Sequence, residues 1–121
     1  MLIQIDYQDK RPIYEQVVEK MQNLIVRGIL KADDKIPSVR NLAIELSINP
    51  NTIQKAYQEL ERMGYIYTVK GRGNFVSAAD NWKDDHKAEC LEELDKIISK
   101  LSAMGVSEQE LIAHLREKRN L

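Results

Sequence analysis

The sequence predicts a mainly helical protein with a small β-hairpin and a two-helix tail. Three observations support this fold class. Residues 38–63 contain two short amphipathic helical patterns separated by a three-residue turn. Residues 65–77 hold two segments typical of strands around a Gly-Arg-Gly turn. A helix-turn-helix followed by such a hairpin is a winged helix, so we predict a winged helix-turn-helix DNA-binding domain at 1–77. The remaining residues, 78–121, are predicted to form a helical dimerisation tail.

The first part of the chain is expected to support the central helices. Residues 2–5 alternate apolar and polar side chains, which suits a short strand or arm. Pro12 fits the start of a helix and Gly28 its end. A polar loop follows, and Ile36 is expected in a short strand against the hairpin. The apolar residues between Pro12 and Gly28 recur at helical spacing and predict one buried face: Ile13, Val17, Met21, Leu24 and Ile25.

The two central helices have clear ends in the sequence. Ser38 is a good N-cap for the first, and Asn49 followed by Pro50 is a good start for the second. Gly64 can adopt the left-handed conformation just beyond the second helix. The short connection forces a steep crossing of the helices. Their apolar faces are expected in the core: Val39, Leu42, Ala43 and Leu46, then Ile53, Ala56, Tyr57, Leu60 and Met63.

The other face of the second helix is polar at its beginning. Asn51, Thr52, Gln54 and Lys55 supply amides, a hydroxyl and an ammonium group. Such side chains on an exposed helix suit reading base edges in a major groove, and the positive end of the helix dipole favours phosphate. Two alternatives to DNA contact stay open: Asn51 and Thr52 only help to cap the helix, and Gln54 and Lys55 form a solvated face. Asn49 is more readily explained as a cap than as a base reader.

Several motifs in the right order resemble the DNA-binding domain of GntR-type bacterial transcription regulators, over roughly residues 10–77. The short tail and the run 49–52 resemble the YtrA-type subfamily. The matching motifs are Pro12-Ile-Tyr-Glu-Gln16, Ile36-Pro-Ser-Val-Arg40, Leu42-Ala43, Asn51-Thr52, Tyr57-Gln-Glu-Leu-Glu61, Gly64-Tyr-Ile66 and Gly71-Arg-Gly-Asn-Phe-Val76.

The resemblance implies that Arg40 contacts DNA and that Arg72 approaches the minor groove. The alternative for Arg40 is a surface ion pair with Glu45. Gly71 and Gly73 are expected to meet the turn geometry of the wing. Arginines that many relatives carry at positions 50 and 54 are absent here, which weakens the transfer of a relative's operator sequence to this chain. The predicted DNA-contacting residues are Ser38, Arg40, Asn49, Asn51, Thr52, Gln54, Lys55, Gly71, Arg72 and Gly73.

Composition narrows the functional class only slightly. The chain has 121 residues, a net charge of −1 and one cysteine. Residues 1–77 hold 11 Lys/Arg and 9 Asp/Glu, whereas residues 78–121 hold 7 and 10, which fits a DNA-facing front and an acidic back. The start lacks the pattern of a signal peptide, no apolar run is long enough for a membrane span, and a lone cysteine suits a reducing cytoplasm. We therefore expect a cytoplasmic protein.

The tail carries a seam typical of a coiled coil. Cys90, Leu94, Ile97, Leu101 and Met104 are spaced 4, 3, 4 and 3 residues apart, and Leu91 and Ile98 widen the seam. After Gly105, a capping box at 107–110 opens a last helix with Leu111, Ile112 and Leu115. Two helices bury too little by themselves, so we expect a second copy of the chain to complete the seam, as in YtrA-type relatives. An apolar effector bound along Leu94, Ile98 and Leu101 is the alternative to simple packing.

Other chemistry has weak support in the sequence. His86, Glu89, Cys90 and Glu93 lie at helical spacing, but such a mixed set on a charged helix is typical of solvated surface, so no metal site is predicted. We find no nucleophile–base pair and no phosphate-binding loop, so no enzyme activity or cofactor is expected. The sequence thus predicts a sequence-specific regulator that binds an inverted-repeat operator as a homodimer and acts as a repressor. The alternative is a winged-helix module that binds proteins without a specific DNA site.

Overall fold

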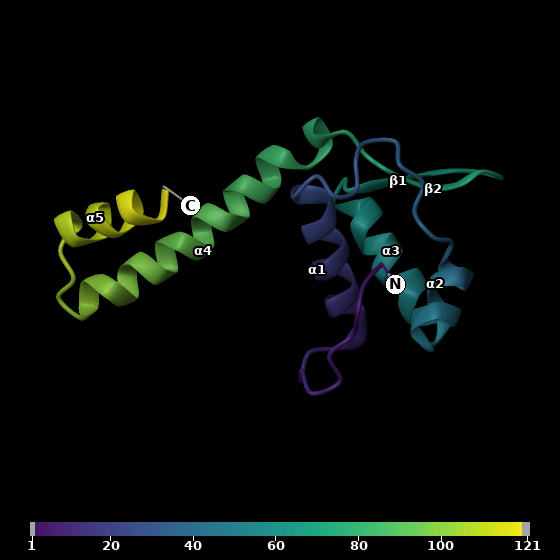
Figure 1. Cartoon of the computed structure of the whole chain (residues 1–121), viewed down its shortest axis with the longest axis horizontal. Coiled ribbons are helices and arrows are strands. Elements are labelled where there is room, and N and C mark those ends of the chain that lie inside the picture. The colour runs from purple at the N-terminus through teal and green to yellow at the C-terminus, as the bar shows by residue number, and fades with distance from the viewer. Residues whose placement is uncertain (1, 120–121) are drawn as a thin grey trace. The chain divides into compact units, whose positions relative to one another are not determined.

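The computed structural model describes residues 2–119 and contains five α-helices and one β-hairpin within that range (Figure 1). The chain divides into two compact units, Met1–Lys83 and Asp84–Leu121. These are called the winged-helix unit and the tail below. The last two residues of the predicted tail, 120 and 121, lie outside the described residues.

The division between the units falls after Lys83, later than the predicted boundary at residue 77. The reason lies in a short 3-10 helix, Ala79–Asn81, and in Trp82 beside it. Trp82 is buried and stacks on Tyr65, with ring centroids 5.3 Å apart. A Cβ at Gly64, whose φ is +86°, would collide with the backbone carbonyl of Asn81. Residues 78–83 therefore pack with the winged-helix unit.

Helix α1 spans Ile13–Val26 and begins directly after Pro12, as predicted. Gly28, with a φ of +75°, lies just beyond its end in the left-handed conformation. Val17, Met21 and Ile25 form its buried face, which confirms the predicted spacing. α1 thus supplies one wall of the core.

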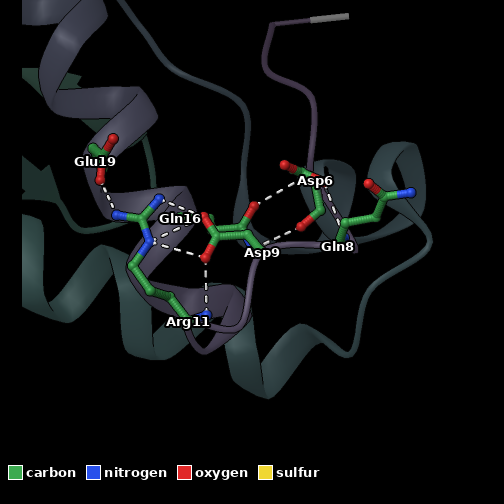
Figure 2. Close-up of polar contacts among 6 residues, drawn as sticks. All are labelled: Asp6, Gln8, Asp9, Arg11, Gln16 and Glu19. Atoms are coloured by element: carbon green, nitrogen blue, oxygen red, sulfur yellow. Dashed lines mark hydrogen bonds and ion pairs between the residues drawn. The ribbon is translucent and has the colours of Figure 1, made fainter.

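The N-terminal arm, residues 2–11, lies over α1 without forming a strand (Figure 2). Gln16 is buried and binds the arm twice: the Asp6 N–H donates to Gln16 Oε1 at 3.0 Å, and Gln16 Nε2 donates to the Asp6 carbonyl at 3.0 Å. Arg11 pairs with both Asp9 and Glu19, and its guanidinium holds the pKa of Asp9 below the ordinary value. These contacts hold the arm in place on α1.

The helix-turn-helix consists of α2, Val39–Leu46, and α3, Pro50–Arg62. Ser38 Oγ accepts the N–H of Asn41 at 3.0 Å, and Asn49 Oδ1 accepts the N–H of Asn51 at 2.8 Å, so both predicted caps are confirmed. The turn between the helices includes Ser47 in the left-handed conformation, with a φ of +56°. This conformation is uncommon for a residue other than glycine and was not predicted.

The wing is an antiparallel hairpin of β1, Ile66–Val69, and β2, Gly73–Val76. Its register pairs Ile66 with Val76 and Tyr67 with Phe75. The segment before α2 joins β2 on its other edge through a single bridge between Lys35 and Phe75. No strand is assigned near Ile36, where a short one was expected; the segment pairs with β2 through this bridge and through backbone hydrogen bonds, among them that from the Ile36 N–H to the Asn74 carbonyl at 3.0 Å.

The core of the winged-helix unit lies between α1, α2, α3 and the inner face of the wing. Its residues come from every part of the unit, including Ile3 of the arm. Of the apolar side chains, those fully or almost fully buried include Val17, Met21, Ile36, Leu42, Ile53, Leu60, Ile66 and Val76. Burial of such side chains is the main force that stabilises this unit.

The tail contains α4, Lys83–Ala103, apart from its first residue, and α5, Glu108–Arg119. Gly105, with a φ of +85°, separates them, and Ser107 Oγ accepts the N–H of Glu110 at 3.2 Å, as expected for a cap. None of the described residues 84–119 is buried. The predicted seam residues are half-buried or exposed: Cys90, Leu91, Leu94, Ile97, Ile98, Leu101, Met104, Leu111 and Leu115.

Candidate nucleic-acid interface

The first two turns of α3 present the predicted polar stripe. Asn51, Gln54 and Lys55 are exposed, and Thr52 is half-exposed. They lie opposite Ile53, which is fully buried, so packing against the core fixes which way they face. Residues 49–58 include no acidic side chain, and the unpaired N–H groups at a helix start add positive potential. This end of α3 therefore suits an anionic ligand.

Lys55 is held by a contact that the sequence did not reveal. Its Nζ lies 3.9 Å from the ring centroid of Tyr14, at the beginning of α1. A cation over an aromatic ring is attracted by the negative face of the ring. Lys55 therefore extends along the α1 side of the stripe. Helical spacing on α3 alone carries no signal for this contact, because Tyr14 lies far away in the sequence.

Ser38 and Arg40 lie at the start of α2. The Ser38 hydroxyl oxygen serves as the N-cap, as described above. Arg40 is exposed, and none of the ion pairs among residues 2–119 links it to Glu45, the alternative partner considered from the sequence. The guanidinium group thus lies at the surface beside a helix start.

Tyr57 fixes the position of α2 relative to α3. Its ring is buried, and its hydroxyl donates to the carbonyl of Pro37 at 2.7 Å. Burial raises the pKa of Tyr57 above its ordinary value, and the charge of Glu45 adds to the effect. The phenol therefore stays protonated and keeps this bond across the neutral pH range. This bond links α3 to the residue just before the Ser38 cap.

The wing turn contains the three predicted residues Gly71, Arg72 and Gly73. Both glycines have positive φ, +80° and +122°, which confirms that the turn needs their conformational freedom. The Arg72 N–H donates to the carbonyl of Val69 at 2.9 Å, and its side chain is exposed at the tip. The wing thus presents a guanidinium on a closed turn.

The acidic residues of α3 lie at its other end. Glu59 pairs with Arg62, which lowers the pKa of the Glu59 carboxyl. Glu61 Oε2 lies 2.7 Å from Thr68 Oγ1 on the wing. Both carboxylates lie toward the C-terminal end of α3 and have partners there. They therefore do not offset the positive charge at the N-terminal end of the helix.

The exposed face of α3 extends further than the predicted stripe. Gln58 is exposed one turn beyond Lys55, on the same side of the helix. Its spacing from Asn51, Gln54 and Lys55 in the sequence would have been sufficient to include it. Contact between these side chains and DNA stays a prediction, and their exposure agrees with it.

Two features that the described residues lack bear on other functions. No three His, Cys, Asp or Glu side chains in the range 2–119 gather closely enough to hold a metal ion. Over the same residues, no helix combines the length and the apolar character that crossing a membrane requires.

Residues 13–76 match the sequence pattern of the family described as bacterial regulatory proteins, gntR family. The HTH-type transcriptional repressor YtrA of Bacillus subtilis is 41% identical over 118 residues, which cover 96% of this chain and 91% of that protein. A GntR family transcriptional regulator from Listeria monocytogenes has a similar structure, with a TM-score of 0.78 and 36% identity over 93% of this chain and 98% of that one.

A second solved structure matches a smaller part of the chain. The DNA-binding domain of AraR in complex with operator ORE1 aligns with a TM-score of 0.54 and 33% identity, over 60% of this chain and 89% of that one. The family match and the similarity over nearly the whole length agree with the fold described above. The chain belongs to the GntR family of bacterial regulatory proteins, and it is a transcription regulator rather than an enzyme.

Proposed function

We propose that this regulator is a sequence-specific repressor that binds an inverted-repeat operator as a homodimer in the cytoplasm. The observation that carries the proposal is the polar, acid-free start of α3, which the buried face of the helix turns outward, in a unit that also has an exposed Arg72 at the tip of its wing. An α-helix fits the major groove of B-DNA, and an arginine on a wing fits the minor groove. Asn51, Gln54 and Lys55 would face bases, and Arg40 would face the backbone.

The comparisons support DNA as the ligand. The structure of the AraR domain contains an operator, and it is similar to this chain over 60% of its length. The repressor YtrA is similar over nearly the whole chain, including the tail. Repression follows if the bound site overlaps a promoter.

The tail supports a dimer. Its seam residues are exposed although their spacing is that of a coiled coil; Leu94 is 47% and Met104 is 71% exposed. In a dimer, the seam of each copy would cover the seam of the other. Such two-fold symmetry, with the same surface used by both copies, is the commonest among soluble oligomers. Two recognition helices would then reach successive major grooves about 34–36 Å apart, so the operator would be an inverted repeat.

The test measures binding by fluorescence anisotropy to the duplex upstream of the protein's own gene, with a scrambled duplex as control. Specific binding should favour the native duplex by about 1,000-fold or more. Arg40→Ala should weaken binding by about 1–3 kcal/mol. Lys31→Ala is the matched control. Lys31 is an exposed cation in the segment between α1 and α2 and is not among the predicted DNA-contacting residues, so this substitution should leave binding unchanged.

The outcomes separate this function from a protein-interaction module. A DNA-binding protein that contacts several phosphates loses affinity steeply as salt rises, whereas a protein interface of mixed polarity does not. Equal, weak and salt-insensitive binding to both duplexes, together with no enriched sequence in a selection from a random DNA pool, would contradict the proposal.

A further inference from the structure

The hairpin of the wing contains two cations, Lys70 and Arg72, and a third, Lys35, is added to it from the segment before α2. Lys35 precedes α2, yet the bridge between Lys35 and Phe75 places it on the free edge of β2. A Cβ built at Gly73 would lie 3.0 Å from Lys35 Cε and 3.7 Å from Lys35 Nζ. The lysine side chain therefore runs along the wing toward the turn, where it meets the residue next to Arg72.

Backbone hydrogen bonds fix this placement on both sides of Lys35. The Asp33 N–H donates to the Val76 carbonyl at 2.8 Å, and the Val76 N–H donates to the Asp34 carbonyl at 2.9 Å. On the other side, the Ile36 N–H donates to the Asn74 carbonyl at 3.0 Å. Lys35 thus sits on a short edge segment paired with β2, rather than on a free loop.

The neighbouring carboxylates have other partners. Asp33 Oδ1 accepts the hydroxyl of Tyr67 at 2.7 Å, and Asp34 Oδ2 accepts the N–H of Lys31 at 2.8 Å. None of the ion pairs among residues 2–119 involves Lys35. Residues 69–77 of the wing contain Lys70 and Arg72 and no acid. The Lys35 charge is therefore available to a ligand, and it adds to the charge of the tip.

We propose that Lys35 is a DNA-contacting residue that binds a backbone phosphate beside the minor groove approached by Arg72. The inference rests on the proposed DNA-binding function and adds a residue to it. An ammonium group on a flexible stem binds phosphate as a point charge, without reading sequence. Lys35 thus strengthens binding to every duplex equally, whereas the residues of α3 discriminate between sequences.

The experiment separates this role from packing of the lysine stem on Gly73. Lys35→Met keeps an unbranched stem and removes the charge, and Lys35→Arg keeps the charge. Lys31→Met is the matched control, because Lys31 is an exposed lysine shortly before this edge segment and is not part of its bridge with β2. Anisotropy gives the affinity for the native and the scrambled duplex between about 50 and 200 mM salt, the range over which phosphate contacts show their effect. Thermal unfolding of each variant reports on the fold.

Loss of one phosphate contact should reduce the slope of log affinity against log salt by about 0.9, and affinity should fall roughly five- to tenfold near 0.1 M salt. The loss should be the same for both duplexes, Lys35→Arg should restore it, and Lys31→Met should match wild type. The unfolding midpoints should not change.

An unchanged slope for Lys35→Met, in a background where wild type binds DNA with a normal slope, overturns the proposal. A lowered unfolding midpoint with that unchanged slope would assign Lys35 to packing instead. Wild-type protein that binds neither duplex would overturn the DNA-binding function itself, and the role of Lys35 with it.

Discussion

The winged-helix unit and the tail are both built from amphipathic helices, but only the first covers its apolar faces. In the winged-helix unit, residues such as Leu42, Ile53 and Leu60 are fully buried. In the tail, Leu94 and Ile97 are about half exposed although their spacing is equally regular, with 47% and 52% of each residue exposed. The spacing of apolar residues thus predicts which face of a helix is apolar, but it does not predict which other element or chain packs against that face.

The difference has a physical origin in the number of elements. The winged-helix unit brings three helices, an arm and a hairpin around one core, so each apolar face finds a neighbour. The tail has two helices of 21 and 12 residues, too few to enclose a core of their own. The first unit is therefore complete within one chain, and we infer that the second is completed by another copy.

The largest effect should come from opening the closed core. Leu60→Ala removes a side chain that is 0% exposed, and it should lower the free energy of unfolding by about 2–5 kcal/mol. Denaturant unfolding measures the loss. The matched control is Gln58→Ala on the same helix, whose exposed side chain should change stability by less than about 0.5 kcal/mol. Equal losses for both variants would contradict the assignment of the core.

The next effect should come from charging the uncovered seam. Leu94→Asp would place two carboxylates in a dimer seam, so the chain should become monomeric, and affinity for a two-fold operator should fall about 100-fold or more. Light scattering and anisotropy measure the two changes. Ser99→Asp puts the same charge on the outer face of α4 and should keep the dimer. If Leu94→Asp stays dimeric, another surface holds the two copies together.

A smaller effect should come from the bond that joins the two central helices. Tyr57→Phe keeps the buried ring and removes the hydroxyl that donates to the Pro37 carbonyl. The free energy of unfolding should fall by about 1 kcal/mol, the usual value of one such bond. Chemical denaturation at neutral pH measures it. An unchanged midpoint would mean that water replaces the phenol without cost.

The smallest effect should be a gain. Ser47 is held in the left-handed conformation, with a φ of +56°, which favours glycine. Ser47→Gly should therefore stabilise the winged-helix unit by about 0.5 kcal/mol after the flexibility of glycine in the unfolded chain is counted. Thermal unfolding measures the gain. Ser38→Ala, which removes a cap, should change stability in the opposite direction by about 1 kcal/mol. A loss of stability in Ser47→Gly would show that its side chain makes a contact that outweighs the strain.

Local signals were enough to predict most of the fold. The caps at Ser38 and Asn49, the glycine after α3 and the wing turn each depend on a few neighbouring residues, and the structure confirms them. The polar stripe on α3 was predictable for the same reason, because helical spacing decides which side chains share a face.

Contacts between distant residues were not predictable from one sequence. The ring of Tyr14 beside Lys55, the two bonds between Gln16 and Asp6, and the stacking of Trp82 on Tyr65 join segments that carry no shared pattern. The last of these shifted the boundary between the units, because a change in composition at residue 77 gives no information about where Trp82 packs. The placement of Lys35 on the wing belongs to the same class.

The most direct test of the inferred dimer is the mass of the wild-type protein in solution, measured by light scattering at micromolar concentration. The chain has a mass of 14.0 kDa. A second copy covering the seam of the tail predicts a particle of twice that mass, which Leu94→Asp reduces to the single mass and Ser99→Asp does not. A wild-type particle of 14.0 kDa would contradict the account, because the exposed seam would then have no partner in a second copy.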